Sequence, residues 1–301
     1  MTGQSRSALA GIGLMLTGVF LFSFNDAVGK WLVATYSVGQ LLLIRSATTL
    51  VLLAPFIWRA GRDAFMSAPR PGLQILRIVL STLEVAMFFW AVGYLPLADA
   101  VTFYLAGPIY VTAISALFLK ERVGWRRWTA VLVGFLGVVI ALRPSAGTLT
   151  LPALIALGGS LSFALLMIVT RVLRETNDTV LIATQYVGTL AFGAVTAPFA
   201  WVTPTVYDLT FLSGFGVVSI MALYCVNRSL KLAPASVVVP YQYTLILWAV
   251  LLGWRVFGEV PDGFTLAGGT IIVAAGLYIF WREQVTARAV AFAPAPRPEA
   301  P

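Results

Sequence analysis

Two stretches of the chain, 95–142 and 232–280, share one pattern and decide the fold. The first reads LPLADAVTFYLAGPIYVTAISALFLKERVGWRRWTAVLVGFLGVVIAL, and the second reads LAPASVVVPYQYTLILWAVLLGWRVFGEVPDGFTLAGGTIIVAAGLYIF. At an offset of 137 residues Tyr104 aligns with Tyr241, and Glu121 aligns with Glu259 after a one-residue insertion. Each stretch also ends in a Gly-rich apolar run. The shared pattern predicts an internal repeat.

The composition around this repeat is that of a membrane protein. Apolar residues make up 59% of the 301 residues and charged residues 11%, with a mean hydropathy of +0.91. Soluble domains have roughly 45–50% apolar and about 25% charged residues. The chain has no histidine and one cysteine, Cys225. Histidine-based metal sites and catalytic triads, an internal disulfide and a cysteine zinc site are therefore excluded.

Apolar runs long enough to cross a bilayer recur along the whole chain. A helix needs roughly 20 apolar residues to cross a hydrocarbon core about 30 Å thick. Ten such runs predict an all-α integral membrane protein, at 9–29, 38–58, 72–93, 98–119, 125–142, 150–171, 180–200, 209–230, 234–254 and 264–281. The connections are too short for a soluble domain, and the first run is interpreted as a retained span rather than a signal peptide.

The repeat divides the ten spans into two groups of five. Residues 1–147 form the first half, 148–283 the second, and 284–301 an Ala/Pro-rich tail that we expect to be disordered and cytoplasmic. Because five is an odd number, the second half would be inverted relative to the first. Inverted repeats permit two related conformations of similar energy, which is the physical basis of alternating access.

The distribution of Lys and Arg predicts the orientation. If the N-terminus is cytoplasmic, fifteen basic residues fall in cytoplasmic segments, whereas Lys30, Arg143 and Arg255 lie at the other face. Cytoplasmic loops carry an excess of Lys and Arg. Both termini are therefore expected in the cytoplasm and the protein in the inner membrane, and the net charge of +8 does not indicate a nucleic-acid partner.

Two strings resemble a known family. ALFLKERVGWRRWTAVLVGFLGVVIALRP at 116–144 and FSFNDAVGKWL at 22–32 resemble the EamA-type members of the drug/metabolite transporter superfamily, most closely the bacterial YddG-type amino-acid exporters. The resemblance covers about residues 9–283. It implies a central cavity lined mainly by spans 1, 3, 4, 6, 8 and 9, and substrates drawn from amino acids, nucleotide sugars or lipophilic cations.

Ionisable residues inside the spans are the first candidates for function, because inserting a charge into a membrane costs about 2.5–3.5 kcal/mol. Glu84 lies mid-span on one helical face with Phe88. It contributes to a cavity, or it is a structural partner of Arg77 or Arg45. Asp26 and Lys30 are four residues apart in span 1, a spacing that also suits an interfacial salt bridge, and Asn25 lies beside them. Arg45 is assigned a structural role.

Spans 4 and 9 carry the second set of candidates. Tyr241, Gln242, Thr244 and Trp248 follow Pro240, and Tyr104, the repeat partner of Tyr241, precedes Pro108. Proline frees a backbone carbonyl, which lipid cannot satisfy but a cavity can. We expect the two tyrosines to form facing walls of one cavity; an interfacial aromatic belt is the alternative.

Spans 6 and 8 supply the remaining candidates, which ordinary helix packing would also explain: Ser160, Phe163 and Met167 in span 6, and Tyr224 in span 8.

The combined prediction is a secondary carrier that exports amino acids, with aromatic and other neutral ones among its substrates. Aromatic and thioether surfaces accept varied side chains, while hydroxyls and amides bind an ammonium and a carboxylate. A lipophilic-cation exporter is the alternative, and a membrane-embedded enzyme is a further one. No G-x-x-x-x-G-K-[ST] phosphate loop occurs, and no cofactor is expected. Proton coupling and the oligomeric state stay open.

Overall fold

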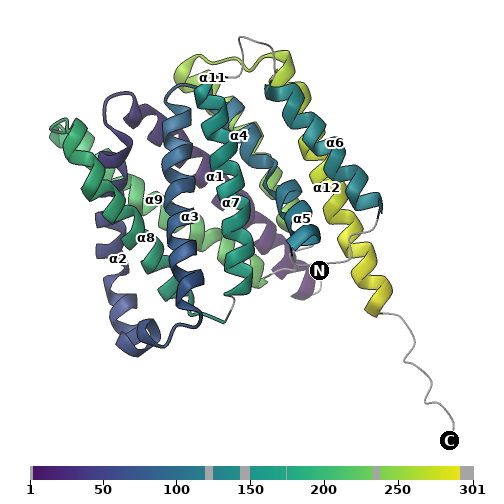
Figure 1. The fold of residues 1–301 in the computed structure, drawn as a ribbon, viewed down its shortest axis with the longest axis horizontal. Coiled ribbons are helices and arrows are strands. Elements are labelled where there is room, and N and C mark those ends of the chain that lie inside the picture. The colour runs from purple at the N-terminus through teal and green to yellow at the C-terminus, as the bar shows by residue number, and fades with distance from the viewer. Residues whose placement is uncertain (1–2, 119–124, 143–149, 174, 233–237, 292–301) are drawn as a thin grey trace, which may run out of the picture.

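The protein is a bundle of helices (Figure 1). The computed structural model describes residues 3–118, 125–142, 150–173, 175–232 and 238–291, and these residues form no β-strand. Their α-helices are α1 (Gly3–Val33), α2 (Val38–Met66), α3 (Pro71–Val92), α4 (Leu97–Leu105), α5 (Gly107–Phe118), α6 (Trp125–Leu142), α7 (Leu151–Val172), α8 (Asp178–Thr196), α9 (Val206–Leu232), α11 (Leu245–Phe257) and α12 (Gly263–Ala291). Two short 3-10 helices are η1 (Ala197–Ala200) and η2 (Val239–Thr244).

Seven of the described helical segments are long and apolar enough to cross a membrane: Leu9–Val33, Val38–Met66, Pro71–Val92, Leu151–Thr170, Asp178–Ala200, Val206–Ser229 and Gly263–Arg282. Two further apolar segments, Leu97–Val111 and Trp128–Ala141, are shorter. The protein is thus an all-helical, multi-span membrane protein. The remaining predicted spans, 98–119, 125–142 and 234–254, fall on helices shorter than those seven.

Prolines explain why two predicted spans are interrupted. The run 98–119 is divided between α4 and α5, where the backbone N–H of Ala106 bonds to the carbonyls of Phe103 and Tyr104. Pro108 follows two residues later and has no N–H to offer the carbonyl of Tyr104. In the run 234–254, Pro240 lies in η2 and the α-helix begins at Leu245. The apolar pattern alone does not predict these breaks.

Helix pairing follows a regular scheme. The most extensive pairings are α1 with α9, α6 with α12, α2 with α8, and α3 with α7. If each first-half helix is exchanged for its predicted second-half equivalent, α1 for α7, α2 for α8, α3 for α9 and α6 for α12, the same four pairings result. Glycine permits a close approach of α6 and α12: a Cβ on Gly268 of α12 would lie 2.6 Å from the carbonyl oxygen of Gly137 in α6.

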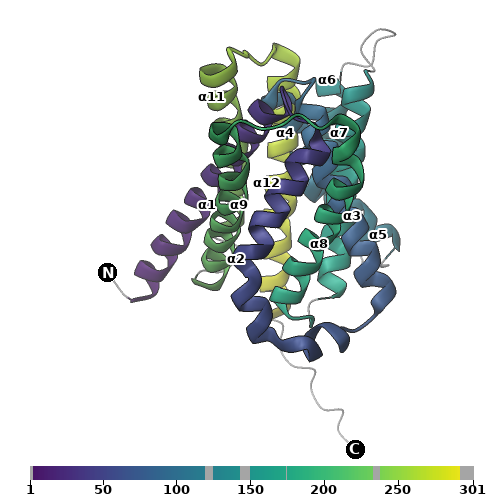
Figure 2. The same cartoon turned by 90° about the vertical axis from the view of Figure 1, so that its left-hand side faces the viewer.

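The two ends of the described chain lie at the same end of the molecule. α1 begins, and α12 ends, at the lower end of the bundle in Figure 2. α12 continues to Ala291, so the helix extends beyond residue 284, where the sequence predicted a disordered tail. Residues 292–301 lie outside the described residues.

Candidate substrate site

Three charged side chains from three helices meet inside the bundle. Asp26 of α1, Arg45 of α2 and Glu84 of α3 are partly buried and interact electrostatically with one another. Nevertheless, within the described part of the chain none of the three forms an ion pair at 4.0 Å or less. The three residues are therefore neighbours without being bonded pairs, and we call them the central charge cluster.

Tyr104 of α4 connects this cluster to an aromatic wall. Its hydroxyl donates a hydrogen bond to the backbone carbonyl of Glu84 over 3.0 Å and lies near enough to the side chains of Glu84 and Asp26 for electrostatic interaction. The ring centroid of Phe88 lies 5.0 Å away and that of Phe163 lies 6.3 Å away. Gly159 of α7 provides the space for the hydroxyl, since a Cβ there would overlap it. The predicted residues Glu84, Phe88, Tyr104 and Phe163 thus come together.

Arg45 is surrounded by aromatic rings rather than by hydrogen-bond acceptors. Its guanidinium carbon lies 4.8 Å from the ring centroid of Phe215 in α9, and 5.9 Å from those of Phe89 in α3 and Tyr186 in α8. Cation–π contacts of this kind stabilise the charge. The Nε of Arg45 is buried and has no hydrogen-bond partner among the described residues.

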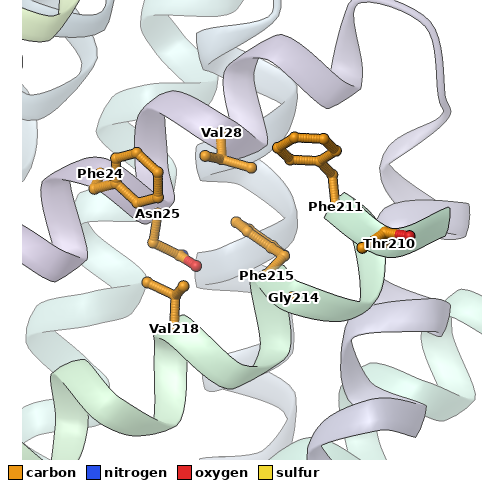
Figure 3. A pocket seen from close by; sticks show the side chains of 8 residues that line it. All are labelled: Phe24, Asn25, Val28, Thr210, Phe211, Gly214, Phe215 and Val218. Carbon is orange, nitrogen blue, oxygen red and sulfur yellow. The ribbon is translucent and has the colours of Figure 1, made fainter. Parts of the chain in front are cut away.

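Asn25 lines an apolar pocket of about 260 Å³ between α1 and α9 (Figure 3). Its side chain is 3% exposed, and its Oδ1 accepts a 3.3 Å hydrogen bond from the hydroxyl of Ser219. Phe24, Val28 and Phe215 contribute to the same pocket. Because Phe215 also contacts Arg45, one ring lies between this pocket and the central charge cluster.

The span 9 candidates lie in a separate cluster. Tyr241 and Trp248 pack against Met15 and Val19 of α1, and the ring centroid of Phe20 lies 4.9 Å from that of Trp248. The indole N–H of Trp248 is buried, with no hydrogen-bond partner in the described ranges. Within the described residues, Tyr104 and Tyr241 therefore belong to different hydrophobic clusters.

Five other candidates occupy varied positions. Ser160 is fully buried beside the hydroxyl of Tyr110, and the hydroxyl of Thr244 donates to the carbonyl of Tyr241 over 2.6 Å. Met167 is 42% exposed and Tyr224 is 65% exposed. Gln242 is exposed as well.

Two ion pairs suggested by sequence spacing are wrong. Lys30 does not pair with Asp26; its Nζ lies 2.6 Å from Oε1 of Glu259, beyond the end of α11. Arg77 does not pair with Glu84, because it donates to the hydroxyl of Thr170, the carbonyl of Leu181 and the side-chain oxygen of Gln185. Arg77 and Glu84 lie about 10 Å apart along α3, at a rise of 1.5 Å per residue.

The sequence reasoning weighed Asp26 as a salt-bridge partner of Lys30 and gave Arg45 a structural role, and it did not predict that both lie near Glu84 or that aromatic rings surround Arg45. Their signal was present, since both charges interrupt apolar spans and such residues are functional candidates by default. In the described residues no three or more metal-ligating side chains gather. The chemistry available at the cluster is consequently electrostatic and aromatic.

Comparison with known proteins places this arrangement in a family. The profile of the EamA-like transporter family matches residues 9–143 and again residues 150–281. A solved structure that is 17% identical superposes with a TM-score of 0.60, covering 92% of this chain and 98% of the other, which supports the fold alone.

Named relatives cover most of the chain. An S-adenosylmethionine uptake transporter of Rickettsia bellii is 27% identical, over 94% of this chain and 98% of that protein. A riboflavin transporter of Vibrio cholerae is 28% identical (90% and 93%), and the pseudopaline exporter CntI of Pseudomonas aeruginosa is 29% identical (88% and 94%). These names denote transporters rather than enzymes. This chain is a multi-span helical bundle that matches the family profile twice, and it therefore belongs to the EamA-like transporter family of small-molecule membrane transporters.

Proposed function

We propose that this transporter carries amino-acid-type metabolites, that is, small molecules with an ammonium group and an apolar or aromatic substituent, out of the cell across the inner membrane. The observation that carries the proposal is the meeting of Asp26, Glu84 and the hydroxyl of Tyr104 beside the rings of Phe88 and Phe163. Carboxylates attract an ammonium group strongly where water is scarce. The rings provide an apolar surface for the substituent.

The chemistry of one relative's substrate agrees with this site. S-adenosylmethionine, named for the Rickettsia bellii relative, is an α-amino acid with an additional positive sulfonium centre. Two carboxylates near aromatic rings suit such a cation, because ring faces also attract positive groups. Uptake and export both occur among the relatives' names, and the gradients of substrate and of any coupled proton set the direction of a carrier.

Alternating access between two inverted halves, 1–147 and 148–283, is the proposed mechanism. Three observations support it: the family profile matches each half, the helix pairings are unchanged when the halves are exchanged, and α1 begins at the same end of the bundle at which α12 ends. With ten membrane crossings and both termini cytoplasmic, each half would cross the membrane five times, so the two halves would be inverted relative to each other. Lys30 and Glu259 then lie at the external face, where their ion pair joins the first half to the second.

Counterflow in proteoliposomes tests the proposal. Vesicles preloaded with unlabelled phenylalanine or methionine should accumulate the labelled amino acid transiently, with saturation, whereas vesicles without protein should not. Absence of counterflow for these and for S-adenosylmethionine, from protein that remains folded, would refute the amino-acid assignment.

A lipophilic-cation exporter is the second candidate. The central charge cluster combines two carboxyl side chains with a single arginine and lies beside aromatic rings, whose faces also attract lipophilic cations. Tetraphenylphosphonium, added to the same vesicles, separates the two functions. Flux of this cation without any amino-acid flux would favour the second candidate.

A further inference from the structure

We infer that Arg45 is the receptor for the carboxylate of the transported molecule, so that the site selects zwitterions over simple cations. The inference rests on the proposed function and assigns a role to the one cation of the central charge cluster. An acidic pair alone would accept any ammonium or quaternary cation, whereas an arginine beside it also requires a negative group.

The surroundings of Arg45 leave hydrogen-bond donors for a ligand. The contacts to Phe89, Tyr186 and Phe215 involve ring faces, which stabilise a cation without accepting its N–H groups in the way that oxygen does. The buried Nε has no hydrogen-bond partner in the part of the chain that the structure describes. A guanidinium offers five donors in a planar fork that matches the two oxygens of a carboxylate.

A purely structural role for Arg45 would give a different geometry. Arg77, which is buried, donates hydrogen bonds from all three of its guanidinium nitrogens, to Thr170, Leu181 and Gln185. Arg45 has Asp26 and Glu84 close enough for electrostatic interaction but not within ion-pair distance. Asp26 and Glu84 therefore interact with the charge of Arg45 from a distance, and its N–H donors stay available to a ligand.

The position of Arg45 also suits a zwitterion. Arg45 projects from α2, while Asp26 and Glu84 project from α1 and α3. An amino acid with its ammonium group near the carboxylates can direct its own carboxylate toward the guanidinium. Its apolar substituent then lies against the rings of Phe88 and Phe163, as in the proposed function.

The test compares a free acid with its ester. Purified full-length protein in proteoliposomes is assayed for competition against labelled phenylalanine by unlabelled phenylalanine and by its methyl ester, which lacks the negative group. In the wild-type protein the free acid should compete about tenfold or more better than the ester, as expected for the loss of a charged hydrogen bond. Equal competition would overturn the inference without any variant.

Variants then assign this preference to Arg45. In Arg45→Gln the affinity for the acid should fall about tenfold to a hundredfold, that for the ester should stay within about twofold, and the preference should disappear. Arg45→Lys keeps the charge but loses the planar fork of donors, so its preference for the acid over the ester should lie between those of the wild type and Arg45→Gln. Arg59→Gln, an exposed arginine on the same helix, is the matched control.

The outcomes separate the possible failures. If Arg45→Gln retains the preference for the acid, or loses acid and ester alike while thermal stability falls, Arg45 is structural and the inference fails while the proposed function stands. If the wild-type protein transports tetraphenylphosphonium but neither phenylalanine nor its ester, the proposed function fails and this inference fails with it. Because the wild-type comparison needs no substitution, a variant that does not fold leaves the test intact.

Discussion

Two groups of oppositely charged side chains in this protein differ in whether they form ion pairs. At the ends of the helices, Lys30 and Glu259 are 2.6 Å apart; Lys30 also donates to the carbonyl of Leu95 over 2.5 Å, and Glu259 accepts from the N–H of Leu97 over 2.9 Å. Midway along the bundle, Asp26, Arg45 and Glu84 are neighbours without an ion pair at 4.0 Å or less in the described residues.

The difference indicates what each group does. The Lys30–Glu259 pair joins the end of α1 to the start of α4 and the end of α11. Its charges therefore hold the helix ends together. The central charge cluster brings two carboxyl side chains and a guanidinium close together without an ion pair among the described residues, and ionisable groups inside a membrane are functional candidates. We therefore interpret the Lys30–Glu259 pair as a structural joint and propose the central charge cluster as the substrate receptor.

Removing the two carboxylates of the central charge cluster should have the largest effect on transport. The double variant Asp26→Asn with Glu84→Gln keeps the side-chain shapes and should lower amino-acid counterflow about a hundredfold, since charged hydrogen bonds contribute about 1.5–3 kcal/mol each. Asp63→Asn, an exposed carboxylate in α2, is the matched control. Unchanged flux in the double variant would remove both carboxylates from the site.

Breaking the joint should affect stability rather than selectivity. Lys30→Ala leaves Glu259 without its cation and should cost about 1–3 kcal/mol, measured as a lower thermal unfolding temperature in detergent. The side chains are 11% and 24% exposed, so water offsets part of the loss. Arg255→Gln, at the same end of α11 but exposed, should change little. A changed preference between phenylalanine and its ester in Lys30→Ala would contradict the separation of roles.

Tyr104 tests how far the receptor extends beyond its charges. Tyr104→Phe removes the hydrogen bond to the carbonyl of Glu84 but keeps the ring beside Phe88. The expected result is a two- to tenfold weaker substrate affinity, corresponding to about 0.5–1.5 kcal/mol, with the acid-to-ester preference retained. An unaltered affinity would limit the receptor to the charged side chains.

Tyr36 should give the smallest effect. It follows α1, and its hydroxyl donates to Asp208 at the start of α9 over 2.7 Å. This hydrogen bond raises the pKa of Tyr36 from its ordinary value of 10.0. The contribution to stability is therefore complete below pH 10 and is lost as the pH rises through the raised pKa. Tyr36→Phe should slightly lower the unfolding temperature at pH 7, and the difference from wild type should vanish in strong alkali.

Much of the architecture could be predicted from the pattern of apolar residues. Such a pattern is local, since each helix must satisfy its own backbone in lipid and needs a minimum apolar length. The helix breaks at Ala106 and before Leu245 were harder to predict from the apolar pattern, although Pro108 and Pro240 indicated them. The candidate site was predicted in part: Glu84, Phe88, Tyr104 and Phe163 do come together, whereas Tyr241 and Trp248 lie in another cluster.

By itself, the sequence determined that this protein is a helical membrane transporter of the EamA type with charges inside its spans. Only the tertiary structure decided which charges meet. Lys30 is four residues from Asp26, yet it pairs with Glu259, and Glu84 faces Arg45 rather than Arg77. Spacing along one helix identifies which residues share a face, but the partner across that face depends on how distant helices pack. The receptor and the joint are therefore products of packing between helices.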